Sequence, residues 1–145
     1  MIEKLKVLTY ITHQGRLLVF RQPDHPEVGI QVPGGSVEPN EDLDAAALRE
    51  AWEETGLHGL VIEAYLGVVV HDLRAKGRDE IYHRHIYHLL CTETPPERWQ
   101  HHEMFPSDGS PAPVLFDLYW VALDDVPPLL AEQDVLLDVL KGRLT

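Results

Sequence analysis

The sequence predicts a mixed α/β (α+β) domain, because strand-like segments dominate the chain, one well-bounded helix interrupts them and a second helix closes it. The 145 residues suit one compact domain spanning residues 1–145, and no internal repeat or shift of composition divides them. With 44% hydrophobic and 25% charged residues, the composition is that of an ordinary globular protein. A disordered or fibrous chain is therefore excluded.

Runs of apolar and β-branched residues predict strands at residues 6–12, 16–21, 30–32, 60–70, 81–92 and 114–123. The first two are joined by Gln14-Gly15, which predicts a β-hairpin. The short strand 30–32 ends at Pro33-Gly34-Gly35. Residues 93–113 contain five prolines and no consistent period, so they are predicted to form a long irregular connection, a kind of segment that tends to be functional.

The helix predicted over residues 41–55 has the clearest boundaries. Asn40 is suited to cap its start, Glu41 and Asp42 place negative charge in its first turn, and Gly56 is suited to end it. A C-terminal helix is predicted after Pro127-Pro128. The leucines that can pack inward there are Leu129, Leu130, Leu136, Leu137 and Leu140.

The charge balance limits the partners. With 24 acidic and 12 basic side chains the formal net charge is −12, which argues against a protein that coats polymeric nucleic acid, since such binding needs Lys and Arg on phosphates. A phosphate-bearing ligand would therefore need a metal ion or a local basic site.

The single cysteine and the apolar segments predict the compartment. Cys91 alone can form neither an intrachain disulfide nor a thiolate zinc cluster, and it favours a reducing, cytoplasmic setting. The first residues lack the apolar region of a secretory signal, and no apolar run approaches the ~18 residues of a membrane span. We expect a soluble protein without a membrane partner.

Three carboxylates share one face of the helix at 41–55. At about 100° per residue, Glu53 and Glu54 lie within about 60° of Glu50. The opposite face is expected to be the core face, and it carries Ala45, Leu48, Ala51 and Trp52.

Like charges at this spacing destabilise a helix by roughly 0.2–0.5 kcal/mol per pair, and Arg49 alone cannot neutralise three of them. A divalent cation would do so, and oxygen ligands favour Mg²⁺, with Mn²⁺ as a substitute. The competing interpretation is a solvated acidic surface, which would be favoured for an arbitrary helix.

The spacing around these carboxylates favours the first interpretation. Gly35 is followed after five residues by Glu41 and, after seven more, by Arg49-Glu50-Ala51-Trp52-Glu53-Glu54-Thr55-Gly56-Leu57. This pattern resembles the signature of the Nudix hydrolases, G-x5-E-x7-R-E-U-x-E-E-x-G-U with U apolar, at every specified position. The resemblance covers Gly35 to Leu57 and extends to the flanking strands and the closing helix.

The resemblance implies a Nudix fold, a mixed β-sheet sandwiched between α-helices. It implies that Glu50, Glu53 and Glu54 bind the metal, that Arg49 orients these carboxylates and that Glu41 supports the helix start. A main-chain carbonyl at Gly34 or Gly35 is expected to join the metal ligands, since glycine lets the backbone approach closely.

The activity implied is hydrolysis of a nucleoside diphosphate linked to another moiety, X. Mg²⁺ lowers the pKa of bound water and screens phosphate oxygens, but a general base is still needed. Glu53 or Glu54 is the first candidate for that base, and Glu103 is the second. The alternative is a Nudix-fold module that binds a nucleotide without cleaving it, although such modules usually lack one of the carboxylates present here.

Three further groups have competing interpretations. Trp99 and Phe105, with His101, His102 and Glu103 beside them, either bind the substrate's base or X moiety or anchor the long connection. His83, His85 and His88 are favoured as ordinary strand residues, because the strand period places His88 on the other face. Arg74, Lys76 and Arg78 form either a solvated turn or a phosphate-binding patch.

The expected partner is thus a small nucleoside diphosphate derivative rather than polymeric nucleic acid or a membrane. The sequence leaves a homodimer open.

Overall fold

The computed structural model describes residues 1–104 and 113–144, and its strands form one mixed sheet. The strand order is β4-β5-β1-β2-β7-β6, and β3 pairs with β1 outside this path. The β1–β5 pair is parallel and the other strand pairs are antiparallel. The strands are β1 (Ile2–His13), β2 (Arg16–Arg21), β3 (Gly34–Ser36), β4 (Leu60–Asp72), β5 (Glu80–Cys91), β6 (Arg98–Glu103) and β7 (Val114–Ala122).

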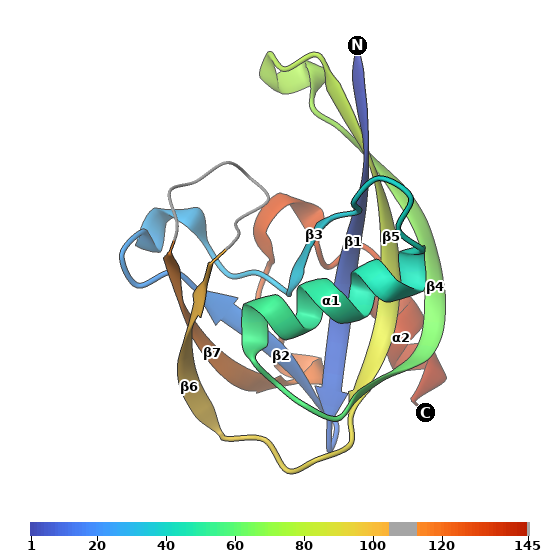
Figure 1. Ribbon diagram of the computed structural model, residues 1–145. Coiled ribbons are helices and arrows are strands. Elements are labelled where there is room, and N and C mark those ends of the chain that lie inside the picture. The colour runs from blue at the N-terminus through green and yellow to red at the C-terminus, as the bar shows by residue number, and fades with distance from the viewer. Residues whose placement is uncertain (105–112, 145) are drawn as a thin grey trace.

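One helix packs on each face of the sheet, as Figure 1 shows, which confirms the predicted α+β fold. Helix α1 (Leu43–Thr55) closes one hydrophobic cluster, and helix α2 (Leu137–Arg143) closes the other. Strand alternation separates the two cores: Val7 and Ile11 face α1, whereas Leu8 and Tyr10 face α2. Four 3₁₀ turns complete the described chain: η1 (Pro26–Val28), η2 (Arg74–Lys76), η3 (Leu123–Asp125) and η4 (Leu130–Glu132).

The predicted hairpin is confirmed. Gln14 and Gly15 adopt φ values of 51° and 76°, the left-handed conformation that a tight turn between twisted strands requires. The two long strands predicted from 60–70 and 81–92 are β4 and β5, and the strand predicted at 114–123 is β7.

The two short elements predicted from local pattern were wrong. Residues 30–32 form only an isolated bridge between Gln31 and Phe20, and the strand here is the glycine-containing β3, which β1 holds by pairing. Residues 98–103, predicted to be irregular, form β6 on the edge of the sheet, because β7 supplies a partner strand. The pairing partner, which local sequence does not reveal, decides both cases.

Helix α1 begins later than predicted and buries a different face. Its N-cap is Asp42 rather than Asn40, whereas Gly56 ends it as predicted, in the left-handed conformation with its N–H bonded to the Trp52 carbonyl. Trp52, predicted to face the core, is 54% exposed. The buried residues of the helix are Ala46, Ala47, Glu50, Ala51, Glu54 and Thr55.

This buried set corrects the predicted separation of the helix into an apolar face and a charged face. Ala46, Ala47 and Glu54 lie within about 60° of Glu50, so the alanines and two of the carboxylates share one buried arc. Alanine side chains let the helix approach the sheet closely, and the carboxylates are enclosed beside them.

The C-terminal helix is also shorter than predicted, because Leu130 to Leu136 form η4 and turns before α2 begins. Leu129, Leu137 and Leu140 are buried, but Leu130 is exposed, contrary to the prediction. Among the described residues, no helix is long and apolar enough to cross a membrane.

Candidate active site

Three carboxylates from two elements converge beside helix α1. Glu50 and Glu53 come from the helix, and Glu103 comes from the end of β6. One oxygen of each lies within 4.8 Å of one oxygen of the other two. Glu50 and Glu103 are buried, so the group is enclosed rather than spread over the surface.

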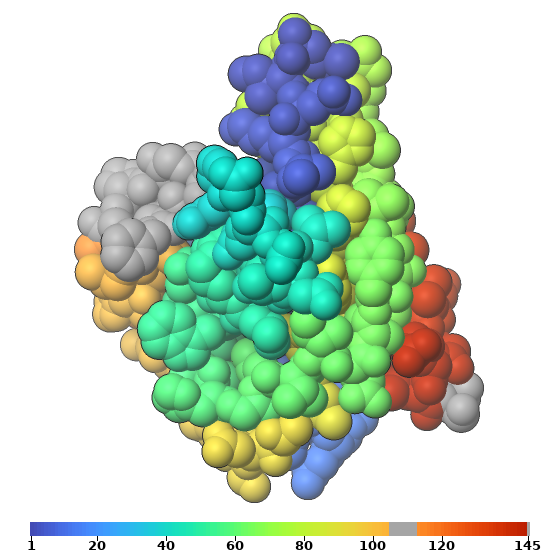
Figure 2. Space-filling model, turned by 45° about the vertical axis from the view of Figure 1, so that its right-hand side comes forward, coloured from blue at the N-terminus to red at the C-terminus, as the bar shows by residue number. Residues whose placement is uncertain are grey.

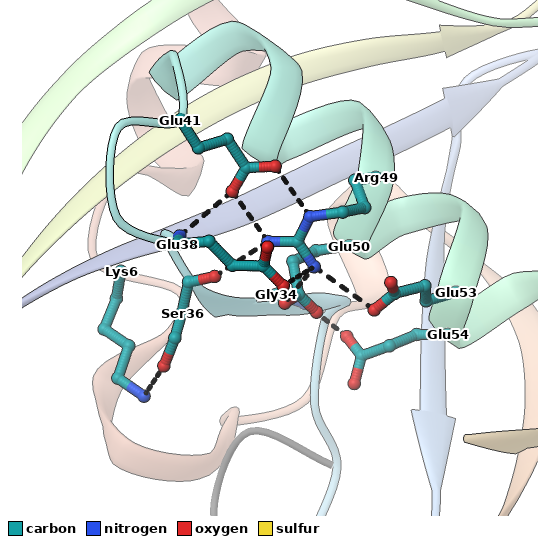
Figure 3. A network of polar contacts seen from close by, with 9 residues as sticks. All are labelled: Lys6, Gly34, Ser36, Glu38, Glu41, Arg49, Glu50, Glu53 and Glu54. Atoms are coloured by element: carbon teal, nitrogen blue, oxygen red, sulfur yellow. Dashed lines mark hydrogen bonds and ion pairs between the residues drawn. The ribbon is translucent and has the colours of Figure 1, made fainter. Parts of the chain in front are cut away.

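Arg49 holds the carboxylates of Glu41, Glu50 and Glu53, as Figure 3 shows. Its guanidinium donates two hydrogen bonds to Glu41, of 2.7 and 2.8 Å, and one of 3.0 Å to Glu50. The same group donates to the Ser36 carbonyl at 3.0 Å and to Glu53 at 3.3 Å. A planar guanidinium with five N–H donors can serve this many acceptors at once, whereas an ammonium group cannot. This geometry fits the orienting role that the sequence predicts for Arg49 and the supporting role predicted for Glu41.

The glycines of β3 fit closely against the helix. The Gly34 N–H donates to Glu54 Oε1 at 2.5 Å, and a side chain at Gly35 would overlap the carboxylate of Glu50. Gly35 therefore has to lack a Cβ for Glu50 to occupy its position. Helix and strand are joined here by contact between the strand backbone and the helix carboxylates.

Burial and neighbouring negative charges disfavour the ionised forms of the enclosed carboxylates. Burial raises the pKa of Glu50 to about 7, even though Arg49 acts in the opposite direction. Burial also raises the pKa of Glu54 well above its ordinary value, and the charges of Glu50 and Glu103 add to that rise. In turn, the hydrogen bonds to Glu41 and Glu50 raise the pKa of Arg49.

A divalent cation fits this group of oxygen ligands. It would supply the positive charge that Arg49 cannot provide alone, and Mg²⁺ and Mn²⁺ prefer carboxylate oxygens.

A cavity of about 270 Å³ opens beside the carboxylates. Glu54 and Glu103 line it at one end, together with Gly34 and Gly35. Leu8, Val32, Val114 and Phe116 supply apolar wall, and Gln22, Gln31 and Gln133 supply amide groups. Apolar walls with a few polar groups are typical of small-molecule sites.

The structure places the other predicted substrate residues differently. Trp99 lies on β6, packs against the core on the α1 side and donates its indole N–H to the Thr55 carbonyl at 2.8 Å. It does not line the cavity, so its position corresponds to the anchoring interpretation. His101 donates to the Glu53 carbonyl at 2.8 Å, which ties β6 to the helix. Phe105 lies outside the described residues.

The three histidines of β5 each have a different partner. His83 contacts Glu3, His85 contacts Tyr65, and His88 lies 2.7 Å from the Thr12 hydroxyl. Among the described residues they share no hydrogen-bond partner, which fits their interpretation as ordinary strand residues.

The basic turn lies in a hairpin tip that projects from the body together with the N-terminus (Figure 2). Arg74 pairs with Asp72 at 2.6 Å, and Arg78 pairs with Glu80. The positive charges of Arg74 and Arg78 are thus paired with carboxylates of the same hairpin, which fits the solvated-turn interpretation.

Sequence reasoning missed two basic residues that line the cavity, Lys6 on β1 and Arg84 on β5. The sequence held a signal for Arg84. It lies two residues from Tyr82 and two from Ile86, so the strand period places all three on one face of β5, and Ile86 is buried.

Comparison with known proteins agrees with this geometry. The model of the family described as NUDIX domain matches residues 4–139. The chain belongs to the NUDIX family. The Gly35–Leu57 resemblance and the predicted fold are therefore confirmed.

Several solved structures share this fold. A MutT NUDIX hydrolase from Burkholderia pseudomallei is 26% identical, with a TM-score of 0.64, and the match covers 95% of this chain and 98% of that one. A MutT protein from Methanosarcina mazei has a TM-score of 0.68 at 19% identity, covering 99% and 96% of the two chains. A UDP-X diphosphatase has a TM-score of 0.70 at 21% identity, covering 99% of this chain and 65% of that one.

Curated relatives match over shorter stretches. An RNA pyrophosphohydrolase of Sphingopyxis alaskensis is 36% identical over 76 residues, 52% of this Nudix chain and 42% of that protein. A putative 8-oxo-dGTP diphosphatase of Bacillus subtilis is 38% identical over 64 residues, 44% of this chain and 37% of that protein. The chain thus matches less than half the length of these relatives. Both are named as enzymes that act on pyrophosphate linkages.

Proposed function

We propose that this Nudix domain hydrolyses the pyrophosphate linkage of a nucleoside diphosphate joined to another moiety, X, with Mg²⁺ or Mn²⁺ as cofactor. The observation that carries the proposal is the convergence of Glu50, Glu53 and Glu103 within 4.8 Å beside a cavity of small-molecule size. The names of the relatives, pyrophosphohydrolase and diphosphatase, point to the same bond.

The protein's own groups divide the work. Glu50, Glu53 and Glu103 would hold the cation, which when bound supplies an acidic water and screens the phosphate oxygens. In this proposal Glu103 replaces Glu54 among the metal ligands that the Nudix resemblance implies. Glu54 lies outside the group of three and accepts a hydrogen bond from the Gly34 N–H. The Gly34 carbonyl remains a candidate further ligand.

Glu54 is the group we assign as general base. It lines the cavity with one oxygen held by Gly34, which fixes the direction of the carboxylate. In the step proposed, a water oxygen bonds to one phosphorus, its proton passes to Glu54, and the bond from that phosphorus to the bridging oxygen breaks. The bridging oxygen leaves with the electron pair, so two phosphate esters result.

A hydrolysis panel tests the proposal. The wild-type protein would be incubated with nucleoside triphosphates, nucleotide sugars, ADP-ribose, NADH and dinucleoside polyphosphates, with Mg²⁺ or with EDTA, and the products separated by chromatography. We expect cleavage at the diphosphate of at least one class, and none with EDTA.

Two variants complete this test. Glu50→Gln should lower the rate at least about 100-fold, because it removes a buried anionic ligand. Glu63→Gln, an exposed change on β4, should retain the wild-type rate. Cleavage that continues in EDTA, or that survives Glu50→Gln, would refute the metal-dependent mechanism.

A further inference from the structure

The cavity beside the carboxylates has a second, basic end. In register, Arg84 on β5 lies opposite Lys6 on β1, and Lys6 lies opposite Ser36 on β3. These residues therefore form a row across three strands, and Arg84 stands on the far side of β1 from the glycines of β3. Two strand spacings of about 4.8 Å put the Arg84 backbone roughly 10 Å from that of Ser36.

Arg84 is a buried cation with few partners. Its residue is 5% exposed and lines the cavity. Its Nη1 donates to the Ala131 carbonyl at 2.7 Å, but its Nε is buried without a hydrogen-bond partner. Within residues 1–104 and 113–144, no carboxylate lies within ion-pair distance of it. A buried charge in this condition is costly unless a ligand supplies the missing partner.

The backbone that contacts Arg84 is strained. Ala131 has φ 51° and ψ 37°, and the next residue, Glu132, has φ 57°. Two successive residues with side chains in the left-handed region are uncommon, and such strain is found where the surrounding structure requires a particular geometry. Here it turns the Ala131 carbonyl toward the guanidinium, which fixes Arg84 in its position at the cavity wall.

The neighbouring groups favour a negatively charged partner. The Lys6 ammonium lies 4.9 Å from the centre of the Tyr82 ring and donates to the Ser36 hydroxyl at 2.7 Å. His71, opposite Tyr82 in register, also lines the cavity. Glu132 offsets the charge of Arg84 only from beyond ion-pair distance. A neutral carbonyl would satisfy one N–H of Arg84 but give its charge no direct partner, whereas an oxyanion would do both.

We infer that Arg84 binds an oxyanion of the substrate, a phosphate or a carboxylate carried by the nucleoside or by X and separate from the diphosphate that is cleaved. This inference rests on the proposed function, since it assigns the far end of the same cavity. Arg84 is thus a specificity-determining residue: substrates with a second anionic group reach it, and their neutral counterparts leave it unpaired.

Matched pairs of compounds test the inference. NADPH and NADH, or coenzyme A and 3′-dephospho-coenzyme A, differ by one phosphate, and UDP-glucuronate and UDP-glucose differ by one carboxylate. Calorimetry with Mg²⁺ gives the Kd of each compound, chromatography afterwards records cleavage, and KM replaces Kd for a compound that is cleaved. The phosphate and carboxylate pairs distinguish the two sources of the anion.

The wild-type protein should bind the charged member of at least one pair about 10- to 100-fold more tightly than its neutral counterpart, the range of a charge-assisted hydrogen bond. Arg84→Met should reduce that ratio below about threefold, and Arg84→Lys should retain part of it, because the charge remains without the planar fork. Arg16→Met, which removes an exposed arginine paired with Glu97, is the matched control and should keep the wild-type ratio.

Equal binding of both members in all three pairs would overturn the inference. So would an Arg84→Met variant that weakens both members alike, the result expected if Arg84 only holds the Ala131 backbone. Should Arg84→Met fail to fold by circular dichroism, Arg84→Lys decides, and an unchanged ratio overturns the inference. A preserved preference without cleavage of any compound would refute the proposed hydrolysis and leave the anion site standing.

Discussion

Arg49 and Arg84 are two arginines of the candidate site, the first half-buried and the second buried, and their surroundings are opposite. Arg49 contacts the carboxylates of Glu41, Glu50 and Glu53, whereas Arg84 has one backbone carbonyl and no acid within ion-pair distance among the described residues. The first region places several carboxylates around one arginine, whereas in the described part of the second the nearest acidic charge acting on Arg84, that of Glu132, lies beyond ion-pair distance. The difference is the basis of the two proposals, a bound cation at the first end and a bound anion at the second.

The largest expected effect is a loss of activity on substitution of Glu54 or Glu103, the two carboxylates that line the cavity. Glu54→Gln should lower kcat about 10²- to 10⁴-fold, because it removes the proposed general base, and added metal should not restore the rate. Glu103→Gln should lose activity that high Mn²⁺ partly restores, because it removes a metal ligand. Rate measurements across a metal titration distinguish the two, and the reverse pattern would exchange the assigned roles.

A lysine in place of either arginine should separate the two ends kinetically. Arg49→Lys cannot form the paired bonds to Glu41 and should lower kcat about 10- to 100-fold, as loss of a residue that orients metal ligands does. Arg84→Lys should instead act chiefly on KM, since the group lies away from the reacting bond. Steady-state kinetics would contradict the comparison if both variants changed the same parameter.

Thermal unfolding should report which end binds a cation. At a Mg²⁺ or Mn²⁺ concentration about 100-fold above Kd, binding to the native state alone adds about 2.7 kcal/mol, or about 5–10 °C in Tm for a chain of this size. Glu50→Gln should remove most of that rise, whereas Arg84→Met should preserve it. A rise of equal size in all three proteins would place the cation elsewhere.

The smallest effect concerns pH in the metal-free protein, where the two ends should respond with opposite sign. Burial raises the pKa of Glu50 to about 7. The contribution of Glu50 to the free energy of unfolding is therefore fully present below about pH 4.5 and is lost as the pH rises through about 7. The loss amounts to at most about 3 kcal/mol. Burial, and then the charges of Arg84 and Lys76, lower the pKa of His71. The contribution of His71 to the free energy of unfolding is therefore present above about pH 6.5 and is lost as the pH falls through its lowered pKa.

Urea unfolding in EDTA between pH 4.5 and 8 would measure both effects as differences from wild type. Glu50→Gln should gain stability relative to wild type as the pH rises, and His71→Gln should gain it as the pH falls. Parallel shifts in the two variants would contradict the opposite charge environments.

The sequence predicted the parts of the fold that local signals determine. The hairpin turn at Gln14-Gly15 and the helix stop at Gly56 require backbone conformations that few residue types tolerate, and both were located correctly. Strand β6 could not be predicted in the same way, because its order depends on pairing with β7 rather than on its own composition.

The candidate site divides along the same line. The spacing of Glu41, Arg49 and the helix carboxylates is local, and the structure brings these groups together as predicted. Glu103 was named only as a second choice for the base, since its place beside Glu50 depends on β6 reaching the helix across the sheet. The sequence wrongly predicted that Glu50 and Glu54 lie on a face opposite the core. Helical periodicity shows which residues share a face, but not whether the rest of the fold buries that face.

The parallel pairing of β1 with β5 also bears on how the chain folds. Residues 14–79, which contain the whole of α1, form a loop closed only when these two strands meet. Closing a loop of this length is entropically unfavourable until the strand contacts form, and non-local pairing of this kind slows folding. Glu103 lies on β6, at the other end of the strand order from β4, so it meets the helix carboxylates through a further long-range contact. The group of three carboxylates is thus complete only when segments distant in the chain have met, and the repulsion from Glu103 adds to that within the helix only then.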